Sequence, residues 1–264
     1  MLLTLPSPRA LRTGVTLILS LLVAGLSLRP LEAPAWEQVR AKQPALRLES
    51  IKDALGQGVT VGLIGGFRAI VADFFWIRTN FVWEQNDLPA TQTSIKLVTA
   101  IDPRPTYFWL NGSRMIAYDM PNWRIDKAGG YDRVPESVKR RFDLEQSKVA
   151  MNYLNEAFGF HPADPLIRLE IANIYLNRLK DTESAAQNYK IAAQHPDAPY
   201  YAARIYAELL RKMNRNTEAY AYLKTLYPTL PKDNLQAMSQ VVLGRISELE
   251  DELAIPVEQR FRPE

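Results

Sequence analysis

The side chains of this sequence that could carry chemistry are few, and they do not form a catalytic set. No phosphate-binding GxxxxGK(S/T) loop, GxSxG nucleophile motif or HExxH zinc motif occurs in the 264 residues. The chain has no cysteine, which excludes disulfides and thiolate chemistry. The sequence therefore predicts a protein that is not an enzyme and that uses no metal or cofactor.

The two histidines and one acidic run are the residues closest to a metal-binding pattern. His161 and His195 each stand directly before a proline that closes a predicted helix. Isolated histidines in such turns cap helix C-termini or lie on the surface more often than they bind metal. The acidic residues within 248–252 lack the glycine-containing turn of hard-cation loops. We therefore interpret the histidines as caps or plain surface residues and the acidic run as a solvated face.

The charge of the chain is distributed unevenly. The net charge is +3, and residues 1–30 carry Arg9, Arg12 and Arg29 with no acidic residue. Without those three arginines the rest of the chain has 29 basic and 29 acidic groups. Since nucleic-acid binding needs an excess of basic residues on one face, the neutral remainder predicts no nucleic-acid partner.

The N-terminus is hydrophobic in the manner of a targeting or anchoring segment. Residues 13–28 contain no charge and follow Arg9 and Arg12. They are short for a spanning helix, which needs roughly 17–25 residues, and a small-x-small sequence follows at 33–35. We expect residues 1–29 to be a membrane anchor or a signal segment, with contact to the membrane through 13–28. An uncleaved anchor, a cleaved signal and a plain hydrophobic N-terminal helix remain as alternatives.

Residues 30–71 are expected to form a linker followed by a glycine-rich segment. Gly58, Gly62 and Gly66 are spaced by four residues, so in a helix they would share one face. Two interpretations stay open for this segment. It is a glycine-rich loop or strand-like segment, or it packs closely against a helix or contacts the membrane surface.

The clearest regularity of the sequence is a ladder of small and apolar residues that recurs three times. Its offsets are four, three and five residues, with four in place of five in the middle copy, and the copies lie 35 and 34 residues apart. The three copies are Ala150, Leu154, Ala157 and Pro162; Ala185, Tyr189, Ala192 and Pro196; and Ala219, Leu223, Leu226 and Pro231. A period near 34 that closes on proline is typical of helix–turn–helix repeats, so the sequence predicts an all-α fold.

The same register extends to four repeat units within a domain at 72–254. A fourth ladder, starting at Thr91, places a first unit before the others. Ser113, Ala172 and Ala207 occupy equivalent positions in their units, and each is a small residue where the two helices of the unit are expected to cross. The second unit is expected to break at Asp119. The predicted parts are units at 72–105, 106–164 with an insertion at 119–137, 165–199 and 200–233, a capping helix at 234–254, and a tail at 255–264.

These ladders resemble those of the tetratricopeptide repeat (TPR) superfamily over about residues 72–233. The third unit departs from the pattern by one extra residue between its helices, and the second unit is split. The sequence at 65–68, followed by 72–76, also resembles the start of a group of membrane-anchored bacterial repeat proteins of unsettled function. The resemblance implies a TPR-like α-solenoid, with an N-terminal hydrophobic helix ahead of it, that acts as a binding scaffold.

The resemblance further implies which side chains line the concave groove. Asparagine can pair with a peptide backbone through both donor and acceptor, and arginine can hold a carboxylate with two bonds. The carboxylate-clamp pattern of chaperone-binding members is matched only by Asn173 and Arg204, so we infer no binding of chaperone tails. The expected groove residues are Tyr107, Arg114, Asn173, Asn177, Arg204, Arg211 and Lys212.

The resulting hypothesis is a protein–protein interaction scaffold, membrane-anchored or exported, that binds a peptide or helix of a protein partner in its groove. The alternative is a structural assembly component that uses its convex face or the 119–137 insertion. The expected location is the bacterial inner membrane with the repeat domain in the periplasm. The cytoplasmic side and a cleaved, exported form are the alternatives, because basic residues follow the apolar segment.

Overall fold

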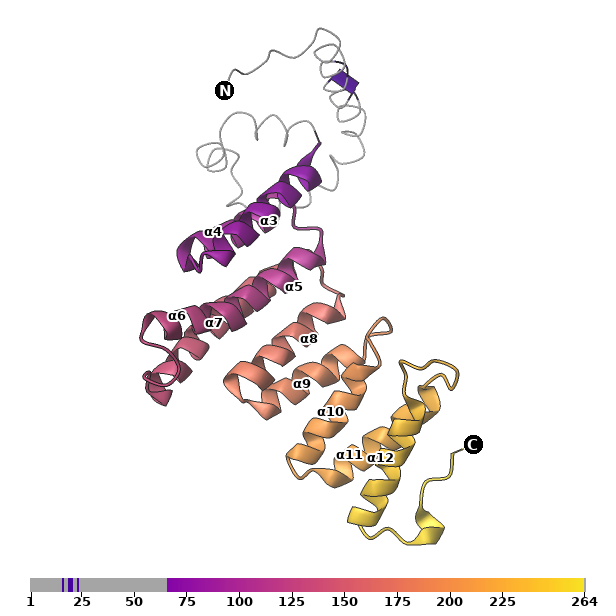
Figure 1. The fold of residues 1–264 in the computed structure, drawn as a ribbon. Coiled ribbons are helices and arrows are strands. Elements are labelled where there is room, and N and C mark those ends of the chain that lie inside the picture. The colour runs from indigo at the N-terminus through magenta and orange to yellow at the C-terminus, as the bar shows by residue number, and fades with distance from the viewer. Residues whose placement is uncertain (1–15, 17–18, 21–22, 24–65, 264) are drawn as a thin grey trace, which may run out of the picture. The chain divides into compact units, whose positions relative to one another are not determined.

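The computed structural model describes residues 16, 19–20, 23 and 66–263 (Figure 1). All regular structure in these residues is helical, and they contain no strand, which confirms the all-α class. The chain divides into two compact units, Met1–Phe108 and Trp109–Glu264. The division falls within one helix, α5 (Thr106–Arg114), and each unit is described separately below.

The described part of the first unit is a helical hairpin. Helix α3 (Arg68–Glu84) packs against α4 (Leu88–Ile101). The turn between them places Asn86 in the left-handed region at φ 55°, which reverses the chain within three residues. Asp87 then caps α4, because its Oδ1 accepts a hydrogen bond from the backbone N–H of Ala90 at 3.1 Å.

The second unit continues as further hairpins. The helix begun by α5 runs through the π-helical turn η1 (Met115–Asp119) into α6 (Met120–Lys127) and packs against α7 (Glu136–Ala157). The later elements are α8 (Pro165–Ile174) with the π-helical turn η2 (Tyr175–Leu179), α9 (Thr182–Ala193), α10 (Tyr201–Lys212), α11 (Asn216–Leu226), the 3-10 turn η3 (Tyr227–Thr229), α12 (Ser239–Glu252) and the 3-10 turn η4 (Val257–Gln259). Within this unit α8 packs on α9 and α10 on α11, and each hairpin contacts the next.

The repeated ladder forms the contact between helices. Ala150, Ala185 and Ala219 lie on the second helix of three successive hairpins, α7, α9 and α11, and all three are fully buried. Ala172 and Ala207, on the first helices, are buried as well. Residues of this size let two helix backbones approach closely. Because they recur at a regular interval in the sequence, each hairpin has its close helix crossing at the equivalent position.

The break expected at Asp119 is wrong, because the helix continues through this residue to Lys127. In η1 the backbone N–H of Met120 bonds to the carbonyl of Met115, five residues earlier. The wider turn accommodates Pro121, which has no N–H and whose ring would collide with the preceding turn of a regular α-helix. The 119–137 segment is therefore a lengthened helical hairpin whose turn covers only residues 128–135.

The extra residue expected between the helices of the third unit lies instead inside its first helix. Asn86, Lys180 and Asn214 are the left-handed residues of three equivalent turns. Asn214 follows the buried Ala207 by seven residues, whereas Lys180 follows Ala172 by eight. A π-helical turn holds one residue more than an α-helical turn, and η2 lies between Ala172 and Lys180.

The C-terminal region differs from the expected capping helix and separate tail. The helix begins at Ser239 and not near residue 234, after a turn in which Met238 has φ 50°. Beyond it the chain folds back, and the ring of Phe261 packs edge-on against Tyr227 with centroids 5.7 Å apart. Buried Glu250 accepts a hydrogen bond from the Tyr220 hydroxyl at 3.0 Å, and a second from the backbone N–H of Phe261. The tail is thus part of the packed unit.

The predicted anchor or signal segment at 1–29 and most of the 30–71 segment, with Gly58 and Gly62, lie outside the described residues. The exceptions in the first segment are residues 16, 19, 20 and 23, which are helical and exposed. In the second segment, Gly66 has φ 84°, and only Phe67, the N-cap residue, separates it from α3. No helix among the described residues is long and apolar enough to cross a bilayer.

The close helix crossing makes the ladder intolerant of larger side chains. We expect Ala185→Leu to lower the free energy of unfolding by about 1–3 kcal/mol, because three added carbons must displace packed neighbours. Gln187→Leu on the same helix is the matched control, since Gln187 is exposed and its replacement should change stability by less than about 0.5 kcal/mol. Urea unfolding followed by circular dichroism measures both, and equal effects would contradict the close crossing.

Candidate binding site

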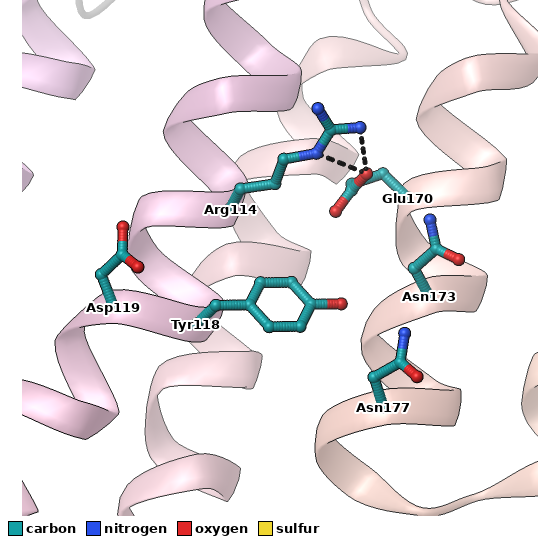
Figure 2. Close-up of a pocket in the computed structure, with 6 residues that line it drawn as sticks. All are labelled: Arg114, Tyr118, Asp119, Glu170, Asn173 and Asn177. Carbon is teal, nitrogen blue, oxygen red and sulfur yellow. Dashed lines mark hydrogen bonds and ion pairs between the residues drawn. The ribbon is translucent and has the colours of Figure 1, made fainter.

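The second unit contains an open pocket of about 430 Å³. It lies between the helix of α5 and η1 on one side and the helix of α8 and η2 on the other, as Figure 2 shows. We call it the Arg114 pocket. Its lining residues are Arg114, Tyr118, Asp119, Glu170, Asn173 and Asn177.

An ion pair crosses the upper end of the pocket in Figure 2 and joins its two walls. The Nε and Nη2 atoms of Arg114 donate to Oε2 of Glu170 at 3.0 and 2.9 Å. The Glu170 side chain is only 3% exposed, whereas that of Arg114 is 52% exposed. A buried carboxylate without a partner would be strongly destabilising. Separating α5 from α8 would break this ion pair, so the pair stabilises the contact between the two helices.

Three tyrosines lie around the buried carboxylate. Burial raises the pKa of Tyr118 and of Tyr201 above its ordinary value, and the charge of Glu170 acts in the same direction at both. Burial also raises the pKa of Tyr189 to about 12. All three hydroxyls are therefore neutral at physiological pH, and that of Tyr118 belongs to a residue that lines the pocket.

Two asparagines present amide groups to the pocket from one helix face (Figure 2). The Tyr189 hydroxyl donates to Oδ1 of Asn173, which fixes the orientation of that amide. Nδ2 of Asn173 makes no hydrogen bond to another described residue. Asn177 interacts with Tyr118 on the opposite wall and thereby opposes the rise in the pKa of that tyrosine. The pocket thus offers amide donors and acceptors held at a fixed separation.

Both π-helical turns of the second unit contribute to this pocket. Tyr118 and Asp119 belong to η1, and Asn177 belongs to η2. The neighbouring Arg178 of η2 pairs with Asp143 of α7, and its guanidinium lies 5.6 Å from the centre of the Tyr118 ring. Because π-helical turns cost helix stability, they are found frequently at functional sites.

The structure brings three of the predicted groove residues together. Arg114, Asn173 and Asn177 all line the pocket, although Arg114 lies more than fifty residues before the other two in the chain. Tyr107 belongs to the first unit, where its ring lies 5.7 Å from that of Trp76.

The remaining predicted groove residues lie on α10, away from the pocket. Nη1 of Arg204 donates to the carbonyl oxygens of Gln236 and Ala237 at 2.9 and 3.0 Å, so it holds the loop that leads into α12. Burial lowers the pKa of Arg204 without removing its charge. Lys212 is exposed near the C-terminal end of α10.

Arg211 serves the packing of α10 against α12. Its Nη2 donates to Oε1 of Glu252 at 2.8 Å, and it also lies within ion-pair distance of Glu208 and Glu248. Arg204 and Arg211 thus both contact the chain's own C-terminal elements.

Sequence reasoning missed three residues of the pocket, which are Tyr118, Asp119 and Glu170. Glu170 precedes Asn173 by three residues and Asn177 by seven, a spacing that places all three on one helix face. Tyr118 follows Arg114 by four residues and would have been found in the same way. Asp119 itself lies at the expected break of the helix, where no groove position is expected.

The two histidines end helices of the second unit. The backbone N–H of His161 donates to the carbonyl of Ala157 at 2.9 Å, and that of His195 to Ala192 at 3.0 Å. Nδ1 of His195 also accepts from the backbone N–H of Asp197 at 3.2 Å. Both histidines thus lie just beyond the helix ends, whose C-cap residues are Phe158 and Gln194.

Comparison with known proteins assigns no family to this chain. The sequence matches no model of a protein family, and a search of the curated proteins finds no match to it.

The tyrosine cluster predicts how stability depends on pH. The folded pKa of Tyr189, about 12, is above that of an unfolded tyrosine, about 10. Its contribution to stability is therefore complete below pH 10 and is lost as the pH rises through 12. We expect Tyr189→Phe to cost about 1 kcal/mol at pH 7 through the lost hydrogen bond to Asn173, and to cost less than this near pH 12.

Urea unfolding of the wild type and of Tyr189→Phe at several pH values from 7 to about 12 tests this expectation. Tyr131→Phe is the control, because Tyr131 is half-exposed. A cost for Tyr189→Phe that stays constant across this range would show that the hydroxyl titrates as it does in the unfolded chain.

Proposed function

We propose that this chain is a TPR-like scaffold that binds an extended peptide segment of a protein partner in the Arg114 pocket. The support is the agreement between the repeat period of the sequence and the successive helical hairpins with buried small residues at their crossings. Repeats of this kind use the first helices of their hairpins as a binding surface, and both walls of the pocket come from first helices.

The observation that carries this proposal is the pair of asparagine amides. Asn173 and Asn177 are four residues apart on one helix, roughly one turn, which separates them by about 5–6 Å along its axis. In an extended peptide, backbone groups that point to the same side recur about every 6.8 Å, two residues apart. Two amides at this separation come close to that repeat, and Nδ2 of Asn173 can donate to a carbonyl while its Oδ1 accepts from Tyr189.

Arg114 favours a peptide backbone over a carboxylate as the ligand. Its Nε and Nη2 atoms are engaged by Glu170, so Nη1 is the part of the guanidinium left for a ligand. The positive charge of the guanidinium is balanced by Glu170, and Asp119 adds a negative charge to the lining. A neutral carbonyl oxygen is therefore a better partner for Nη1 than a ligand carboxylate, which Glu170 and Asp119 would repel.

The proposed location follows from the N-terminal sequence. The uncharged run at 13–28 attaches the protein to a bacterial inner membrane, and the repeat units act in the periplasm on a partner of the envelope. The cytoplasmic side and a cleaved, exported form are the alternatives. In each of these cases the pocket has the same role.

The pocket can be tested with peptides selected for binding to the whole chain from a displayed random library. We expect the double variant Asn173→Ala, Asn177→Ala to weaken binding of the selected peptides by about tenfold or more, since each lost amide hydrogen bond is worth about 0.5–1.5 kcal/mol. Fluorescence anisotropy with labelled peptides measures the change in dissociation constant.

Asn155→Ala is the matched control, because Asn155 is an exposed asparagine on α7 that does not line the pocket. Selected peptides that bind the pocket variant and the control equally well would refute the proposed site. They would favour the alternative function, an assembly component that binds through the lengthened hairpin at 119–137 or through the convex face.

A further inference from the structure

Helix α3 of the first unit exposes a row of large apolar side chains. Ile70, Phe74, Ile77 and Phe81 are between 61% and 69% exposed. Their spacing of four, three and four residues places them along one face of the helix, and we call this row the α3 stripe. The opposite face is occupied, because α3 buries Ala72, Phe75, Trp76 and Thr79.

Exposed apolar residues on most protein surfaces are scattered singly, whereas those of the stripe are adjacent to one another. Four adjacent side chains of this size form a contiguous patch, and patches of this kind in soluble domains mark sites of interaction. The exposed charges of α3 beside the stripe are Asp73, Arg78 and Glu84, which give no excess of positive charge. Helices that lie on anionic lipid surfaces carry many basic residues, so the charges of α3 do not favour such a surface.

The stripe is complementary to itself when a second copy runs in the opposite direction. The spacing of its residues is the same when read from either end, and isoleucine and phenylalanine alternate along it. In an antiparallel pair each phenylalanine faces an isoleucine, so large and smaller side chains interdigitate at every layer. A parallel pair would place phenylalanine against phenylalanine and isoleucine against isoleucine.

We propose that two copies of this chain associate through the α3 stripe as an antiparallel, twofold-symmetric helix pair. Phe74 of one copy packs against Ile77 of the partner subunit, and Ile70 packs against Phe81 of the partner subunit. Each surface contacts the same surface of the other copy, which gives a closed dimer and not a filament.

The size of the stripe sets the strength of this contact. Standard interfaces bury about 800 Å² on each partner, and one pair of short helices buries less than this. The dimer is therefore weak in dilute solution and forms where the local concentration of the chain is high. The contact is independent of the Arg114 pocket, because all four side chains belong to the first unit.

The absence of cysteine from the natural sequence makes disulfide crosslinking a clean test. In the antiparallel pair, position 70 of one copy lies opposite position 81 of the other. Two copies of position 70 are separated by eleven residues, or about 16 Å, which is far beyond the reach of a disulfide. We expect an oxidised mixture of full-length Ile70→Cys and full-length Phe81→Cys, with different tags, to form a mixed dimer. Each variant oxidised alone should give no dimer.

The control mixture pairs Ile70→Cys with Lys96→Cys, since Lys96 is exposed on α4 outside the stripe. A dimer from Ile70→Cys alone would show a parallel pair, and the same yield from the control mixture would show unspecific contact; either result overturns the proposal. Absence of any dimer overturns it as well. In that case, protection of the thiol in the Ile70→Cys variant from a thiol reagent by phosphatidylcholine vesicles would identify the stripe as a lipid contact.

Discussion

The architecture depends on one steric constraint, which is that the two helices of each hairpin cross where only a small side chain fits. Ala150, Ala185 and Ala219 have no exposed surface, and each lies on the second helix of its hairpin. Because the crossing fixes how the hairpin can close, it also fixes which side chains of the first helix face the neighbouring hairpin. The pocket is a consequence of this arrangement, since both of its walls are first helices.

The same constraint explains the π-helical turn η2 of the second unit. The crossing residue Ala172 and the left-handed residue Lys180 must both keep their places, so an additional residue between them has to be absorbed within the helix. The turn η2 absorbs it, and the side chains that follow the extra residue are rotated relative to those of a regular helix. Asn177 lies in this turn and faces Tyr118 of the other π-helical turn. The departures from the repeat are thus the features that shape the pocket.

The sequence was sufficient to predict the helices and their pairing, because small residues at one period report directly on buried crossings. It was insufficient for the helix through Pro121, since Asp119 followed two residues later by a proline gives the same local signal whether the helix ends or widens. Glu170 was missed for a different reason. A buried carboxylate is tolerated here only because Arg114, 56 residues earlier in the chain, neutralises it, and no local pattern reports such a partner.

Arginines of the second unit form ion pairs and hydrogen bonds between helices, and Arg114 also lines the pocket. Arg204 and Arg211 contact the loop before α12 and α12 itself, and Arg245 of α12 pairs with Glu208 of α10 at 2.6 Å. Exposed ion pairs contribute little stability singly, but charges crossed in both directions between two helices oppose sliding of one along the other. A ligand that used Arg204 or Arg211 would have to break these contacts and loosen the C-terminal end of the unit. The ion pair of Arg114 with Glu170 uses Nε and Nη2, so the binding proposed for Nη1 would not require that loss.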